Sequence, residues 1–319
     1  MEGDIPAPGN GEWPELRLIC SAASRRHHLP VLHHQGNRSL NLRTAILTLI
    51  AMLAFAGNSL LCRLALKDGP IDAASFTAIR IVAGAAVLAV LMRVRGAGPL
   101  AAGSWRSAVA LFVYAAAFSF AYLGLSAATG ALLLFGAVQA TMIGYGLWRG
   151  ERFTGWQWLG LALASAGLLM LLLPGLVAPS LSHGLLMASA GIAWGVYSLR
   201  ARGSGDPTAA TTGNFVRAAA LAAATGLALL PWSTFTGRGM MLALTSGALT
   251  SGLGYVIWYR ALQGLAATTA ASVQLSVPVL ATLGGVVLLA EPVTAQLLYA
   301  AAALLGGLGL VILAGPGRK

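Results

Sequence analysis

The sequence predicts an all-α polytopic membrane protein with ten transmembrane helices, arranged as two inverted five-helix repeats. The 319-residue chain is 57% hydrophobic and 9% charged, with a mean hydropathy of +0.78, whereas a soluble domain carries about 25% charged residues. Apolar stretches of bilayer-spanning length follow one another from residue 43 to residue 314. Motifs of the first half of this region recur in the same order in the second half.

Residues 1–42 differ from the rest of the chain. They contain four acids and four of the five histidines, and their apolar piece LRLICSAA is too short for a signal-peptide core. We interpret them as a disordered cytoplasmic tail. The histidine pairs 27–28 and 33–34 are possible metal ligands, but no carboxylate or thiol pattern accompanies them. We therefore expect no metal site and no cofactor.

The spans follow from length and from helix breakers. A membrane helix needs roughly 20 mostly apolar residues, and linkers such as KDGPID, RGAGP and RARGSGDP separate the candidates. The first repeat is predicted at 43–173 and the second at 182–314. The predicted spans are 43–66, 73–93, 105–124, 127–149, 154–173, 182–200, 211–231, 239–261, 265–289 and 295–314.

The basic residues orient the chain. If the N-terminus is cytoplasmic, twelve Lys and Arg residues lie at inner span ends or in the tail, and three lie at outer ends, namely Arg63, Lys67 and Arg238. This asymmetry predicts that both termini are cytoplasmic. It also accounts for most of the net charge of +11 without a nucleic-acid partner.

The repeat is clearest where GERFTG at 150–155 matches AEPVTA at 290–295. An odd number of spans per copy makes the second copy insert upside down, as in secondary transporters with a site at the repeat interface. Since Glu151 and Glu291 each precede the fifth helix of their copy, we interpret them as structural charges that offset the dipole of that helix. The alignment also pairs Thr154 with Thr294 and Gly167 with Gly307.

Further matches carry a family resemblance. FTAIR in the second span corresponds to NFVR in the seventh, and a Tyr-x-x-Leu motif precedes an Ala/Thr-rich stretch in each copy. Pro278 lies in the ninth span, although the first copy has Val138 instead. In this order the motifs resemble the EamA-type branch of the drug/metabolite transporter superfamily over about residues 43–314. Within it, the chain is most similar to the YddG-type exporters of aromatic amino acids. The resemblance implies export across a bacterial inner membrane.

Polar and aromatic side chains recur along single helical faces near the middle of several spans. Each aromatic alone is explained by helix packing, but together with midplane amides they fit an uncharged cavity for a small amphiphile. Aromatic faces would attract an ammonium group, and amides would bind a carboxylate. The predicted substrate-binding residues are Asn58, Tyr114, Phe118, Tyr122, Gln139, Trp194, Tyr197, Tyr255, Tyr259 and Gln274.

The charged residues limit the mechanism. None of the nine acids falls in the middle of a span, so the carboxylate relay typical of proton-coupled transporters is missing. We hypothesise a facilitator, or weak coupling to the proton gradient. Arg80 and Arg217 lie six or seven residues inside their spans. We interpret both as structural charges that tie their helices to carbonyls at the rim, and treat a carboxylate-binding role as the alternative.

These observations favour a secondary transporter that exports aromatic or apolar amino acids, or similar small amphiphilic metabolites, by alternating access. Its expected partners are a small-molecule substrate and the lipid bilayer. No span interior holds a histidine, which argues against intramembrane proteases and oxidases. Multidrug and nucleotide-sugar or phosphometabolite transporters of the same superfamily are the alternative. Phosphorylated substrates, however, call for several cations in the cavity.

Overall fold

The computed structural model describes residues 42–150, 152–172, 180–201, 205–262, 265 and 273–314. These residues form helices joined by short connections, with one isolated β-bridge and no strand among them. The predicted tail, apart from Leu42, lies outside the described residues, as does Glu151. The prediction of an all-α protein is confirmed.

Each predicted span contains a helix. By length and composition, five helical segments within the described part of the chain are long and apolar enough to cross a membrane: 42–66, 73–94, 127–148, 237–261 and 295–313. The first copy comprises α2 (Leu42–Leu66), α3 (Ala73–Val94), α4 (Trp105–Ala121), α5 (Ala127–Trp148) and α6 (Gly155–Leu172). The second comprises α7 (Leu181–Ala201), α8 (Pro207–Ala228), α9 (Gly237–Thr245), the π-helical segment η2 (Ser246–Leu253), α10 (Gly254–Leu262), α12 (Ser276–Leu289) and α13 (Ala295–Leu313), with the short 3-10 turn η1 (Leu230–Trp232) after α8.

Two boundaries differ from the prediction for clear reasons. The seventh helix begins at Pro207 rather than residue 211, because the Asp206 carboxylate caps it and proline suits the first helical position. In the ninth span, α12 begins at Ser276, and residues 266–272 lie outside the described residues.

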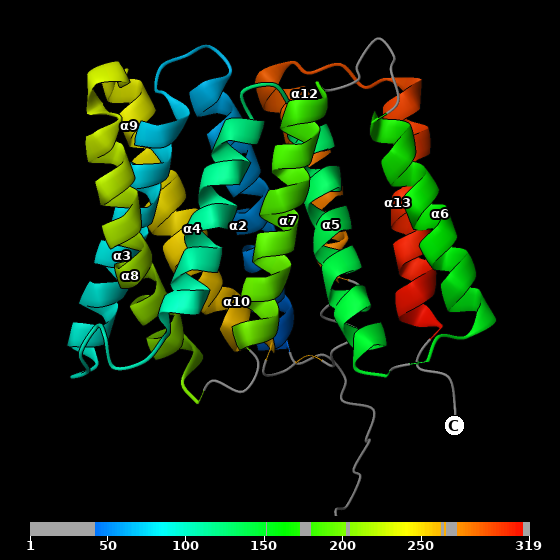
Figure 1. Cartoon of the computed structure of the whole chain (residues 1–319), viewed down its shortest axis with the longest axis horizontal. Coiled ribbons are helices and arrows are strands. Elements are labelled where there is room, and N and C mark those ends of the chain that lie inside the picture. Colours follow the sequence, from blue (N-terminus) through cyan, green and yellow to red (C-terminus); the bar gives the residue numbers. More distant parts are fainter. Residues whose placement is uncertain are drawn as a thin grey trace, which may run out of the picture. The chain divides into compact units, whose positions relative to one another are not determined.

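The helix pairs follow the repeat. Helix α3 packs on α8, α5 on α12 and α6 on α13, so that the second, fourth and fifth helices of one copy meet their counterparts in the other. Helix α2 contacts α12 and the α9–α10 span, just as α7 contacts α5 and α4. Exchanging the two copies therefore maps one set of contacts onto the other, as an inverted repeat requires. Figure 1 shows α6 and α13 side by side at one edge of the bundle.

The two ends of the bundle can be told apart. A contact between Arg63, near the end of α2, and Glu291, just before α13, places these two points at the same end. The start of α2 and the end of α13 therefore lie at the opposite end. We call the end at which α2 begins and α13 ends the inner end, after the predicted cytoplasmic side, and the other the outer end.

Glycines bring α6 and α13 into backbone contact. A Cβ atom on Gly307 would lie 2.5 Å from the carbonyl oxygen of Gly160, and one on Gly167 would lie 2.6 Å from the Leu304 nitrogen. Small residues allow such close approach where lipid supplies no hydrophobic drive between helices. The repeat-paired glycines 167 and 307 therefore meet in one interface.

We expect Gly307→Ala to destabilise the protein by about 1–3 kcal/mol, because the added methyl group has no room in this interface. The matched control is Gly306→Ala, one residue earlier on the exposed face of α13, where an added Cβ meets nothing within 4 Å. Thermal melting of the purified variants in detergent would measure both. Equal melting temperatures would contradict the close packing of α6 on α13.

The connections of the two copies are joined at the outer end by Asp72. Its Oδ1 accepts a hydrogen bond from the Ser75 nitrogen at 2.8 Å, which caps α3, and its Oδ2 accepts one from the Thr234 nitrogen at 2.9 Å. Beside it, Ile71 pairs with Phe235 in the isolated bridge. Asp206 occupies the matching cap position of α8, where its Oδ1 accepts from the Thr208 nitrogen at 2.8 Å.

Partial burial raises the pKa of Asp72, but the hydrogen bonds from Ser75 and Thr234 outweigh it and hold the pKa below the ordinary 3.8. The ionised carboxylate thus stabilises the fold above that value, and the contribution is lost as pH falls through the folded-state pKa. We expect Asp72→Asn, which can still cap α3, to show less acid destabilisation below about pH 4. Melting temperatures measured across this range test it; identical slopes for both proteins would refute the role.

Candidate substrate site

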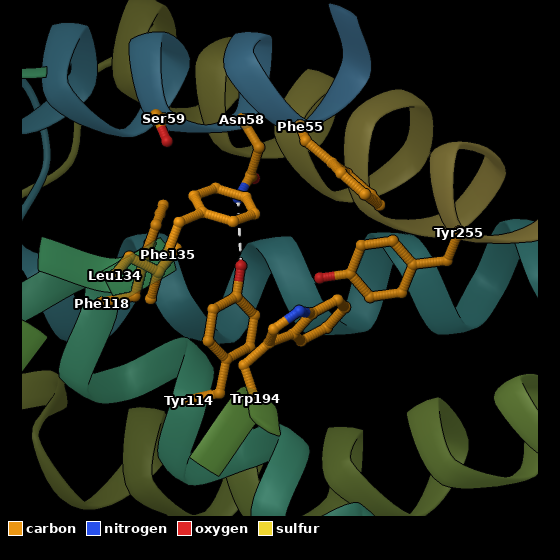
Figure 2. Close-up of a pocket in the computed structure, with 9 residues that line it drawn as sticks. All are labelled: Phe55, Asn58, Ser59, Tyr114, Phe118, Leu134, Phe135, Trp194 and Tyr255. Atoms are coloured by element: carbon orange, nitrogen blue, oxygen red, sulfur yellow. Dashed lines mark hydrogen bonds between the residues drawn. The ribbon is translucent and has the colours of Figure 1, made fainter. Parts of the chain in front are cut away.

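Aromatic side chains from both copies meet around a small central cavity (Figure 2). Its volume is about 20 Å³, room for about one water molecule. Five of the predicted substrate-binding residues belong to its lining, which also includes Phe55 and Ser59 of α2 and two residues of α5. The lining consists of Phe55, Asn58, Ser59, Tyr114, Phe118, Leu134, Phe135, Trp194 and Tyr255.

Asn58 is the centre of a buried polar cluster. Its Oδ1 accepts hydrogen bonds from the hydroxyls of Ser246 at 2.8 Å, Thr250 at 3.3 Å and Ser251 at 3.4 Å. Its Nδ2 donates to the Tyr114 hydroxyl at 3.4 Å (Figure 2). A buried amide needs such partners where no water reaches it.

The three hydroxyls come from the π-helical segment η2, and the sequence analysis did not place them in the site. A π-helix bonds each residue to the one five positions on, so residues four and five apart share a face. Ser246, Thr250 and Ser251 thereby reach the same amide oxygen. The available signal was the hydroxyl-rich run TSGALTSG at 245–252 in an otherwise apolar span.

Five aromatic rings form a continuous series through the bundle. Successive ring centroids lie 4.8 Å apart from Tyr122 to Phe118, 5.5 Å to Tyr114, 4.9 Å to Trp194 and 5.5 Å to Tyr197. The distances are those of favourable tilted and edge-to-face pairs. The series begins beside the outer end of α4 and passes through the central cavity to the inner part of α7.

The inner end of this series opens on a second, larger hollow, which we call the inner cleft. Its volume is about 280 Å³. Two of the predicted residues, Tyr197 and Tyr259, line it rather than the central cavity. Its wall carries polar side chains, and Arg200 Nε donates to the Ser107 hydroxyl there at 3.1 Å. The lining residues are Ala102, Gly103, Ser104, Ser107, Tyr197, Arg200, Gly205, Asp206, Pro207, Ala210, Thr211, Asn214 and Tyr259.

An ion pair lies at the outer end of the bundle. Arg63 Nε donates to Glu291 Oε1 at 3.0 Å, and Arg63 Nη1 donates to the Tyr122 carbonyl oxygen at 2.9 Å. Glu291 Oε2 accepts from the Ala127 nitrogen at 2.8 Å, the first helical nitrogen of α5. Both charges are largely buried, with 15% and 8% of their side chains exposed. This network joins α2, α4, α5 and the connection before α13.

The expected role of Glu291 at its own helix is therefore wrong. Its carboxylate stabilises the N-terminus of α5, while α13 is capped by Thr294, whose hydroxyl accepts from the Leu297 nitrogen at 3.2 Å. The corresponding threonine of the first copy, Thr154, caps α6 in the same way. Thr154 and Gln157 exchange side-chain and backbone hydrogen bonds at the start of α6, a capping box. The threonine of Glu-x-x-Thr thus supplies the cap in both copies.

Three predicted residues line neither hollow. Tyr122 is fully buried with its ring against Phe118, and Gln139 is buried on α5. Gln274 is half-buried just before α12. Their assignment to the substrate stays a prediction.

The two deep arginines have different surroundings. Arg217 Nη1 donates to the carbonyl oxygens of Ala102 and Gly213, both at 2.9 Å, which are rim contacts of the kind a structural role requires. Arg80 does not reach the rim, contrary to our expectation. Its side chain is buried in α3, and its guanidinium carbon lies 5.1 Å from the ring centroid of Phe118 and 5.7 Å from that of Tyr114.

The fold and the cavity between two copies are those of a membrane transporter, and comparison with known proteins agrees. Residues 182–313, nearly the second predicted repeat, match the EamA-like transporter family. An uncharacterized protein of Pseudomonas aeruginosa is 59% identical over 278 residues, 86% of this chain and 96% of that protein. One crystal structure has a TM-score of 0.61 at 21% identity, over 86% of this chain and 99% of that one, which is a likeness of fold. The chain belongs to the EamA-like transporter family, whose members are transporters rather than enzymes.

Proposed function

We propose that the protein is a secondary transporter that exports aromatic or apolar amino acids, or similar small amphiphilic metabolites, across a bacterial inner membrane. The observation that carries the proposal is the central cavity, where rings, an amide and hydroxyls from both copies converge. A repeat interface near midplane is where inverted-repeat transporters bind their substrates. The flat rings suit an aromatic side chain, and the hydroxyl and amide groups suit a polar head group.

The arrangement of the hollows supports alternating access. The Arg63–Glu291 pair closes the outer end, the central cavity holds about one water, and the inner cleft lies toward the cytoplasm. We infer a state closed on the outer side, with a central cavity too small for an amino acid. Release to the outside then requires Arg63 to separate from Glu291.

The lining favours amino acids over phosphorylated metabolites. Among the described residues, none that lines the central cavity is charged, whereas a phosphate group is normally bound by several cations. The described acids, Asp68, Asp72, Asp206 and Glu291, lie at or beyond helix ends. This distribution supports a facilitator, or weak coupling to the proton gradient, over a midplane carboxylate relay.

The direct test is counterflow of labelled amino acids in proteoliposomes, with and without a pH gradient. We expect saturable exchange of phenylalanine and similar apolar amino acids that survives removal of the gradient. Trp194→Ala should lower the rate about tenfold, corresponding to about 1.4 kcal/mol of binding. Trp148→Ala, at a position 78% exposed on α5, is the matched control and should leave the rate unchanged. Exchange of no amino acid, or equal effects of both substitutions, would overturn the assignment.

The outer closure gives a second test. Glu291→Gln removes the charge that holds Arg63, so we expect it to shift the protein toward outer-open states. Cys62, fully buried next to Arg63, then becomes accessible to a membrane-impermeant maleimide added from outside. The experiment uses Cys20→Ser protein, with Asp68→Asn as a control acid at the same end. Equal labelling rates for Glu291→Gln and the parent would argue against the pair as a closure.

A further inference from the structure

Arg80 is a deeply buried cation with no acidic partner among the described residues. It lies in α3, eight residues beyond the cap at Asp72, with 2% of its surface exposed. Its guanidinium carbon lies 5.1 Å from the ring centroid of Phe118, 5.7 Å from that of Tyr114 and 5.8 Å from that of Phe76. Arg63, by contrast, is paired with the Glu291 carboxylate.

One nitrogen of Arg80 is unsatisfied. Nη1 is buried and has no hydrogen-bond partner within the described part of the chain. Other arginines of the bundle differ in this respect: Arg63 donates to a carboxylate and a carbonyl, and Arg217 to two carbonyls. Three ring faces attract the cation, but they accept none of the hydrogen bonds that a guanidinium donates in a plane. A buried charge left in this way is costly, and within a membrane such residues usually serve function.

The covering rings connect Arg80 to the substrate site. Tyr114 and Phe118 line the central cavity and also stack on the guanidinium. The cavity of about 20 Å³ admits no amino acid, so binding must displace lining side chains. Movement of these two rings would both enlarge the cavity and uncover the free Nη1. The same motion thus makes room for a ligand and presents a cation to it.

We propose that Arg80 binds the carboxylate of the transported substrate, which identifies the substrate class as apolar or aromatic monocarboxylates, α-amino acids included. The inference rests on the proposed function. A guanidinium matches a carboxylate with two parallel hydrogen bonds. Asn58 lines the cavity, and its Oδ1, which accepts from the hydroxyls of η2, is an acceptor for an ammonium group. Figure 2 shows the hydroxyls of Tyr114 and Tyr255 and the amide of Asn58 directed into the space between the rings.

A single cation favours a monoanion over a phosphate. Arg63 is paired with Glu291 at the outer end, and Arg200 lies on the wall of the inner cleft. Neither lines the central cavity. A doubly charged phosphate would therefore meet one guanidinium, whereas a carboxylate is neutralised by it.

The test compares phenylalanine with three analogues: its amide and phenethylamine, which lack the carboxylate, and 3-phenylpropionate, which lacks the amine. Competition is measured in counterflow and in equilibrium binding to purified protein. We expect the two carboxylates to compete and the two carboxylate-free compounds to bind at least about tenfold more weakly. Arg80→Gln should weaken the carboxylates by about tenfold or more and abolish this discrimination. Arg80→Lys, which keeps the charge, should retain part of it.

The controls separate the possible outcomes. Arg238→Gln, at an exposed position near the start of α9, should leave the discrimination intact. If wild-type protein exchanges phenylalanine and its amide equally well, Arg80 is not the carboxylate site, although the transport function stands. Arg80→Gln protein that binds phenylalanine within about twofold of wild type would likewise rule out Arg80 as that site. If no amino acid is exchanged at all, the proposed function fails. Binding of 3-phenylpropionate then tests the inference separately. If Arg80→Gln weakens this binding, the inference stands. If 3-phenylpropionate does not bind, or binds equally well to both proteins, the inference is wrong.

Discussion

Satisfying polar groups without water is the constraint on which this structure depends. In a bilayer each backbone and side-chain polar group needs a partner within the protein. Asn58 meets this need through hydroxyls of η2, and Arg217 through two carbonyl oxygens. Glu291 and Arg63 meet it through each other and through backbone groups. Each solution joins helices from different parts of the chain, so the polar contacts also hold the two copies together. Arg80 Nη1 is an exception, and it lies next to the candidate site.

The two sides of the bundle use different packing. Between α6 and α13, glycines such as Gly167 and Gly307 allow backbone contact and leave no space for a ligand. Around the central cavity, rings such as Tyr114 and Trp194 separate the helices instead. An aromatic side chain can change the space that it fills by rotating about its two torsions. A glycine has no side chain that could move in this way. The distribution of small and large residues thus places the rigid interface at one edge and the adaptable one at the centre.

Most of the fold could be predicted from the sequence, because membrane helices are set by local length and hydropathy. The repeated motifs also indicated which helix of the first copy corresponds to which helix of the second. Long-range contacts could not be. Nothing in the spacing indicates that Glu291 meets Arg63, 228 residues away, rather than its own helix. The contacts of the η2 hydroxyls with Asn58 were not predicted, because a π-helical turn changes which positions share a face. Tyr197 could be identified as a candidate from its helical face, but only the packing of α7 against α4 assigns it to the inner cleft.

The sharing of Asn58 Oδ1 has a consequence for release. A carbonyl oxygen has two lone pairs, yet three hydroxyls approach this one, so the donors compete. An incoming ammonium group would replace a hydroxyl already bonded there, exchanging one hydrogen bond for another. The free-energy gain of such an exchange is small. A transporter must release its substrate on the other side of the membrane. An acceptor oxygen that already has hydrogen-bond donors within the protein keeps the affinity for the substrate low enough for this release.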